Sequence, residues 1–131
     1  MEMKIAFPGG KKVSAELEGF TLMTDQPREG GGEGSAPTPF QLFLASLGTC
    51  AGIFVLGFCQ KRNLPTQGLE LTQTTHWDEA KHLVSKVELE IRVPAGFPEK
   101  YHDSLIRAAE LCLVKRTLQD PPKFEIAVKA G

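Results

Sequence analysis

Hydrophobic and polar residues alternate along three stretches of this chain, which is the period of a half-buried β-strand. Residues 4–24 alternate, with a turn at Pro8-Gly9-Gly10 and a break at Gly19, and this pattern predicts an antiparallel meander. The stretches 69–77 and 84–93 flank the polar turn Asp78-Glu79-Ala80-Lys81, and the second alternates cleanly. They predict a hairpin with one face in water. The alternation of Phe124, Ile126 and Val128 predicts a short last strand.

Two other stretches have helical spacing. The first begins at Pro39, with Thr38 as its cap, and we expect it to continue to about Arg62, before Asn63-Leu64-Pro65. It is apolar all round, so it must be covered on every side. Its small residues let another backbone approach closely, and they favour a helix of a second copy, hence a homodimer. The small residues are Ala45, Gly48 and Gly52.

The second helix is expected between Pro98 and Asp120, with Leu105, Ala108, Ala109 and Cys112 at helical spacing. Between the last strand of the meander and the first helix, the run TDQPREGGGEGSAPTP has no apolar periodicity. It predicts a long loop, and such loops in compact domains are usually functional or mobile.

Length and charge limit the kind of protein. With 131 residues, the chain suits one domain, residues 1–131. A net charge of −1, with both signs interspersed, predicts no nucleic-acid partner and no basic membrane patch. The apolar run 42–59 is interrupted by glycine, serine and threonine, which favours a core helix over a membrane span. We expect small molecules or further copies of the chain as partners.

The three cysteines are the best indication of chemistry. They are too few for a disulfide framework and no signal peptide precedes the first strand, so a reducing cytoplasm is the expected setting. Cys50 and Cys59 fall on opposite faces of one helix, and Cys59 is interpreted as a small core residue. Cys50 and Cys112 lie on different predicted helices and could meet. The alternative is that both are core packing.

A reactive thiolate needs a cation or hydrogen-bond donors beside it, because apolar burial raises the pKa of a thiol. Each nearby cation also has a simpler interpretation as a solvated surface charge. The candidate cations are Lys11, Lys12, Arg28, Lys115 and Arg116. His76 and His102 have no metal-ligand spacing to each other or to a cysteine, so no metal site and no cofactor are predicted.

Three segments carry a resemblance to the OsmC/Ohr superfamily of thiol-dependent hydroperoxide reductases and their relatives. The loop TDQPREGGGEGSAPTP resembles the family's D-x-P…GG…P-x-P approach to the central helix. QLFLASLGTC resembles its (E/Q)-L-(L/F)-x-A-x-(L/G)-x-x-C, which puts Cys50 at the reactive position. CLVKRTL resembles its C-x-V-x-x-T-L, which puts Cys112 at the second cysteine.

The resemblance implies an OsmC-like α+β fold, with antiparallel sheets around long central helices in an intertwined homodimer. It implies that Cys50 attacks the O–O bond of an organic hydroperoxide or of hydrogen peroxide and becomes a sulfenic acid. Cys112 then resolves it as a disulfide, and a dithiol reductant resets the pair. The implied role is defence against oxidative stress.

The chain departs from the dedicated organic hydroperoxide reductases at the groups that hold their thiolate. Their glutamate position is Phe40 here, with the amide of Gln41 next to it, and their arginine position falls on Lys11. A lysine lacks the planar fork of arginine, so the exchange is not conservative. The thiolate-activating candidates are therefore Lys11, Arg28 and Gln41, and the chain resembles the broad OsmC-like branch.

These departures motivate an alternative function. In it, the same scaffold binds an apolar ligand at the dimer interface, or uses its thiols as a redox sensor, without peroxidase turnover.

Overall fold

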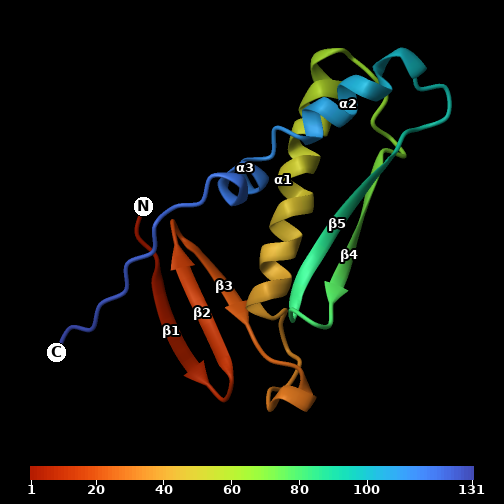
Figure 1. Cartoon of the computed structure of the whole chain (residues 1–131). Helices are drawn as coiled ribbons and strands as arrows, with labels where there is room; N and C mark the ends of the chain where they lie inside the picture. Colours follow the sequence, from red (N-terminus) through yellow and green to blue (C-terminus); the bar gives the residue numbers. More distant parts are fainter. The chain divides into compact units, whose positions relative to one another are not determined.

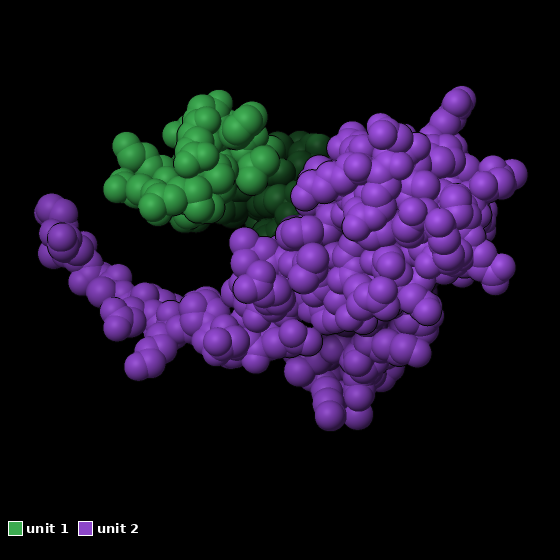
Figure 2. Space-filling model, turned by 90° about the horizontal axis from the view of Figure 1, so that it is seen from above, with its two compact units in different colours: residues 1–45 green, residues 46–131 purple.

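The computed structural model describes all 131 residues, which form two compact units. Unit 1 is Met1–Ala45 and unit 2 is Ser46–Gly131 (Figure 2). The boundary falls inside the long helix α1, and each unit is described by itself below. Whether the chain behaves as the single domain expected from its length stays a prediction.

Unit 1 contains a three-stranded antiparallel sheet in the order β1-β2-β3 (Figure 1). The register aligns Ile5 with Ala15 and Ala15 with Leu22, so the alternating apolar residues share one face. The predicted meander is confirmed. Its strands are β1 (Lys4–Gly9), β2 (Lys12–Leu17) and β3 (Phe20–Thr24).

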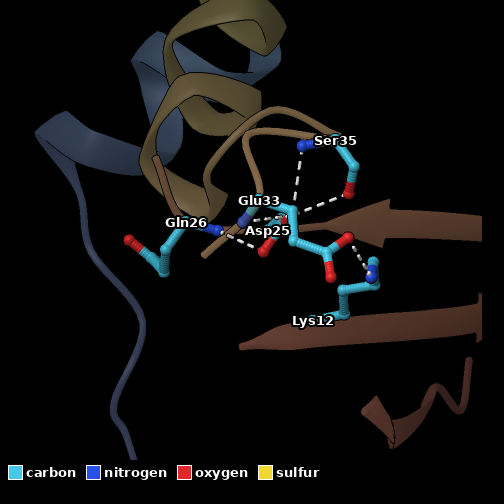
Figure 3. A network of polar contacts seen from close by, with 5 residues as sticks. All are labelled: Lys12, Asp25, Gln26, Glu33 and Ser35. Carbon is cyan, nitrogen blue, oxygen red and sulfur yellow. Dashed lines mark hydrogen bonds and ion pairs between the residues drawn. The ribbon is translucent and has the colours of Figure 1, made fainter. Parts of the chain in front are cut away.

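The glycine-rich loop after β3 is organised around one carboxylate. Asp25 is only 1% exposed and accepts hydrogen bonds from the backbone N–H groups of Gln26 (2.8 Å), Glu33 (3.2 Å) and Ser35 (3.1 Å). The Ser35 hydroxyl donates a fourth at 2.6 Å (Figure 3). Gly32 is required here, because a Cβ would collide with the Gln26 carbonyl oxygen. The predicted loop is thus present and ordered by its own buried acid, with one short 3₁₀ turn, η1 (Arg28–Gly30).

Helix α1 (Pro39–Lys61) begins and ends close to where its sequence predicts. Thr38 and Gln41 form a reciprocal capping box: the Gln41 backbone N–H donates to Thr38 Oγ1 (3.2 Å), and Thr38 N–H donates to Gln41 Oε1 (2.9 Å). The two bonds satisfy donors that the first helical turn leaves without partners.

Only one stripe of α1 is buried within a single chain, formed by Leu47, Ala51, Val55 and Cys59. Ile53 is 60% exposed. By length and composition α1 could cross a membrane, with 22% of its most apolar window buried. This is weak support for a span, since core helices of soluble proteins meet the same criterion.

Unit 2 packs a hairpin against α1. Strands β4 (Glu70–Asp78) and β5 (Leu83–Arg92) pair antiparallel, and Asp78 Oδ1 accepts from Ala80 N–H and Lys81 N–H in the turn. The predicted hairpin is confirmed. The core joins α1 to the next helices and has apolar residues of the hairpin packed against it. In Figure 1 the hairpin runs alongside α1. Its buried members are Val55, Cys59, Phe97 and Leu105.

The predicted second helix is wrong in one respect, because it is interrupted. The structure has a 3₁₀ turn, η2 (Glu99–Tyr101), followed by α2 (His102–Ala109) and, after a break, α3 (Leu113–Gln119). Cys112 lies at the break, with the extended backbone angles φ −46° and ψ 119°. The apolar spacing continues across the break, so the sequence pattern did not reveal it.

The predicted last strand is also wrong, since residues 120–131 contain no regular structure. Phe124, Ile126 and Val128 are 84%, 96% and 99% exposed. Alternation marks one apolar face, but a strand forms only where an edge accepts its hydrogen bonds. The fold class is nevertheless as expected: small antiparallel sheets and three α-helices make an α+β chain.

Candidate functional site

Cys112 is held at the start of α3 by two hydrogen bonds through its sulfur. Its Sγ accepts from the backbone N–H of Lys115 at 3.4 Å, so the thiol itself caps the helix. The same Sγ donates to the carbonyl oxygen of Leu47 on α1 at 3.7 Å. Cys112 is 2% exposed. The cap therefore fixes a buried thiol against the helix that carries Cys50.

Cys50 lies near Cys112, and both thiols are free. The backbone N–H of Val114 lowers the pKa of the Cys50 thiol, burial opposes it, and the Cys112 thiol and the Leu113 N–H lower it further. The net direction is downward, because donors that face a sulfur favour its charged form. The surroundings therefore favour the thiolate that nucleophilic chemistry needs.

The three leading N–H groups of α3 thus all act on sulfur: those of Leu113 and Val114 lower the pKa of Cys50, and that of Lys115 donates to Cys112. A helix start leaves such groups without intrahelical partners, and it carries a partial positive charge. Sequence reasoning looked for a side-chain cation and missed these donors. The signal that could have found them is a helix start at Cys112.

Cys59 has the opposite environment. It is fully buried in the core of unit 2, and burial raises the pKa of its thiol, against a smaller lowering by Arg62. A protonated thiol in an apolar core is unreactive. Its interpretation as a core residue agrees with this placement.

The candidates Lys11, Arg28 and Gln41 belong to unit 1, whereas the two thiols belong to unit 2. Lys11 packs beside Gly31, Arg28 is exposed in η1, and Gln41 is engaged in the capping box. A role for any of them at Cys50 stays a prediction.

The remaining cations have other positions. Lys12 forms an ion pair with Glu33 at 3.0 Å in the loop network (Figure 3). Arg116 is exposed on α3, and Lys115 lines a cavity beside Cys112. His76 contacts Glu88 at 3.0 Å on the wet face of the hairpin. No group of three or more His, Cys, Asp and Glu side chains is placed to hold a metal ion.

A pair of proline substitutions separates the backbone donors from side-chain cations. Val114→Pro removes the main N–H donor to Cys50, and proline is tolerated in the first turn of a helix. We expect the Cys50 thiol pKa to rise, because its largest stabilising contact is lost. The measurement is the pH dependence of Cys50 alkylation by iodoacetamide, followed by peptide mass spectrometry.

Val114→Ala is the matched control, since it trims the side chain and keeps the N–H. Leu113→Pro follows the already extended Cys112, which suits a residue before proline, and should give a smaller rise. An unchanged Cys50 profile in both proline variants would contradict activation by α3.

The family model described as OsmC-like protein matches residues 32–127, well over half of the chain. The chain belongs to this family. The match includes both thiols of the site. No curated protein matches the chain.

Solved structures show the same fold. A proposed osmotic stress induced and detoxification response protein from Psychrobacter arcticus is 22% identical, with a TM-score of 0.74 over 88% of this chain and 85% of that one. An organic hydroperoxide resistance protein from Legionella pneumophila is 21% identical, with a TM-score of 0.57 over 91% and 90%. A hypothetical protein from Aquifex aeolicus is 17% identical, with a TM-score of 0.69 over 92% and 87%. At these identities the likeness shows the OsmC-like fold alone.

Proposed function

We propose that the protein is a thiol-dependent peroxidase that reduces small organic hydroperoxides or hydrogen peroxide with Cys50 and Cys112. The observation that carries the proposal is the contact between a thiol with lowered pKa and a second free thiol at the same helix start. Membership of the OsmC-like family supports it, and the Legionella relative is named for organic hydroperoxide resistance.

The reaction balances over three steps. The Cys50 thiolate attacks the distal peroxide oxygen, the O–O bond breaks, and the leaving alkoxide takes a proton to become an alcohol, with Cys50 left as a sulfenic acid. The Cys112 sulfur then attacks the Cys50 sulfur, releases water and forms a disulfide. A dithiol reductant returns both cysteines to thiols by two exchange steps and becomes a disulfide itself.

Mass spectrometry of the folded protein after one equivalent of cumene hydroperoxide tests the proposal directly. A loss of about two mass units mapped to a Cys50–Cys112 peptide pair is expected for disulfide formation. An unchanged mass, with all thiols titratable after unfolding, would contradict it.

The second candidate is a ligand-binding or redox-sensing protein without peroxidase turnover. An apolar cavity next to Cys112 favours it, together with Phe40, half-exposed and stacked on Phe43, at the family's glutamate position. It predicts a melting temperature that rises with an apolar ligand while peroxide is not consumed. A peroxidase rate well above background would exclude it.

A homodimer is part of the proposal, because α1 exposes an apolar face with small residues within one chain. Ala45, Thr49 and Ile53 recur along this face at helical spacing and are all exposed. We expect a solution mass of about twice 14.3 kDa by light scattering at micromolar concentration.

Light scattering of the Ile53→Glu variant tests whether this face of α1 forms the dimer interface. A buried glutamate without a partner is costly, so we expect this variant to shift toward the monomer. Leu83→Glu, at an equally exposed site in unit 2, is the control and should stay dimeric. A wild-type chain that is monomeric would contradict the homodimer.

A further inference from the structure

Unit 2 contains a cavity of about 360 Å³, within the size range of small-molecule sites. Four elements supply apolar walls: one face of β5, helix α2, one turn of α1 and, through Leu118, helix α3. The two charged lining residues, Glu110 and Lys115, have opposite signs. The cavity therefore suits an uncharged, apolar body.

The cavity adjoins one of the two thiols and not the other. Cys112 lines it, and so do Leu47 and Lys115, the two residues to which Cys112 Sγ is hydrogen-bonded. Cys50 is not among the lining residues. Cys50 is partly exposed, whereas Cys112 is only 2% exposed and borders the cavity. A molecule in the cavity therefore meets the Cys112 side of the pair.

We infer that this cavity binds the reductant, a small apolar thiol, and that its sulfur attacks Cys112 Sγ of the Cys50–Cys112 disulfide. The inference rests on the proposed function, which supplies that disulfide. The reductant thiolate forms a mixed disulfide with Cys112, the S–S bond to Cys50 breaks, and Cys50 leaves as a thiolate. A second thiol, from the same dithiol or from another reductant molecule, then attacks the reductant sulfur of the mixed disulfide. Cys112 leaves as a thiolate and the reductant is oxidised to a disulfide, so two electrons pass to the protein.

The surroundings of the two sulfurs favour this direction of attack. In thiol–disulfide exchange the more acidic thiol is the better leaving group. Cys50 leaves toward the Val114 and Leu113 N–H groups, which favour its thiolate. Peroxide reacts with the partly exposed Cys50, and the reductant approaches Cys112 from the cavity. The two substrates then need not share one pocket.

The test uses a chain with Cys59→Ala, so that only the two site cysteines remain, oxidised either by cumene hydroperoxide or by diamide. The oxidised protein is mixed with benzyl mercaptan or with 2-mercaptoethanol, quenched in acid, and mapped by peptide mass spectrometry. We expect the benzyl adduct on Cys112 with Cys50 free. Because its ring is buried in the cavity, benzyl mercaptan should reduce the disulfide faster than 2-mercaptoethanol does, by about tenfold or more.

Ala109→Phe places a ring in the cavity, and it should remove that preference for benzyl mercaptan. Ala80→Phe, at the exposed hairpin turn, is the matched control and should keep the preference. An adduct on Cys50, or equal rates for the two thiols in the unsubstituted chain, would overturn the inference without any use of the variants.

The two oxidants separate the inference from the proposed function. If peroxide fails to form the disulfide while diamide forms it, the peroxidase proposal fails and the cavity is still tested. If peroxide forms the disulfide and the adduct maps to Cys50, the peroxidase stands and the cavity inference fails. If neither oxidant joins the two cysteines, both fail.

Discussion

Substitution of Cys50 by serine is expected to reduce peroxide consumption to the uncatalysed background, a loss of at least about a thousandfold. A serine hydroxyl at this position is not ionised at neutral pH, so the donors that favour the thiolate have no anion to stabilise. The measurement is the initial rate of cumene hydroperoxide loss with a dithiol reductant. A rate equal to that of the unsubstituted chain would show that Cys50 is not the nucleophile.

Two further variants sharpen this result. Cys59→Ala removes the core thiol and should keep the rate, since that thiol is fully buried away from the site. Cys112→Ser should keep the first attack and lose the disulfide, so that dimedone traps a sulfenic acid on Cys50. A Cys112→Ser chain that still turns over as fast as the parent would remove Cys112 from the mechanism.

Asp25→Asn is expected to loosen the glycine loop and to remove part of the acid sensitivity of unit 1. The Ser35 hydroxyl and N–H, followed by the Gln26 N–H, hold the pKa of this carboxyl well below its usual range. A carboxyl whose pKa is lower in the folded state binds fewer protons there than when unfolded. Its stabilising contribution is therefore full above the unfolded pKa of about 4 and is lost as the pH falls further.

Hydrogen exchange at the Glu33 and Ser35 amides provides the measurement, because both donate to Asp25. At neutral pH the asparagine variant should exchange about tenfold faster or more at these positions, since an amide accepts through one oxygen only. Asp103→Asn, an exposed position at the start of α2, is the control and should leave the loop unchanged. Equal protection of the loop in both variants would show that Asp25 does not organise it.

Local signals account for the parts of the fold that were predicted well. The cap at Thr38, the stop near Asn63 and the turn at Asp78 each act through hydrogen bonds between residues a few positions apart. Such contacts can be predicted from the order of neighbouring residues alone. The strands of the meander and the hairpin follow for the same reason.

Two predictions failed where the signal was not local. The break at Cys112 brings its Sγ to the Leu47 carbonyl, which lies 65 positions earlier in the chain and accepts a hydrogen bond from it. The tail around Ile126 alternates like a strand, but no strand of its own chain pairs with it. The spacing of apolar residues shows which face of a segment is apolar. It does not show which distant segment of the chain packs or pairs with that face.

The sequence by itself determined the family, the α+β class, the order of the meander, the central helix and the hairpin, and the two thiols worth testing. These follow from motifs, caps, turns and alternation, which are properties of neighbouring residues. Only the tertiary structure decided that the backbone of α3, through Val114 and Leu113, favours the Cys50 thiolate, and that a cavity adjoins Cys112 alone. The physical reason is that hydrogen-bond donors and cavity walls act through distance in space, and folding brings them to the sulfurs from distant parts of the chain.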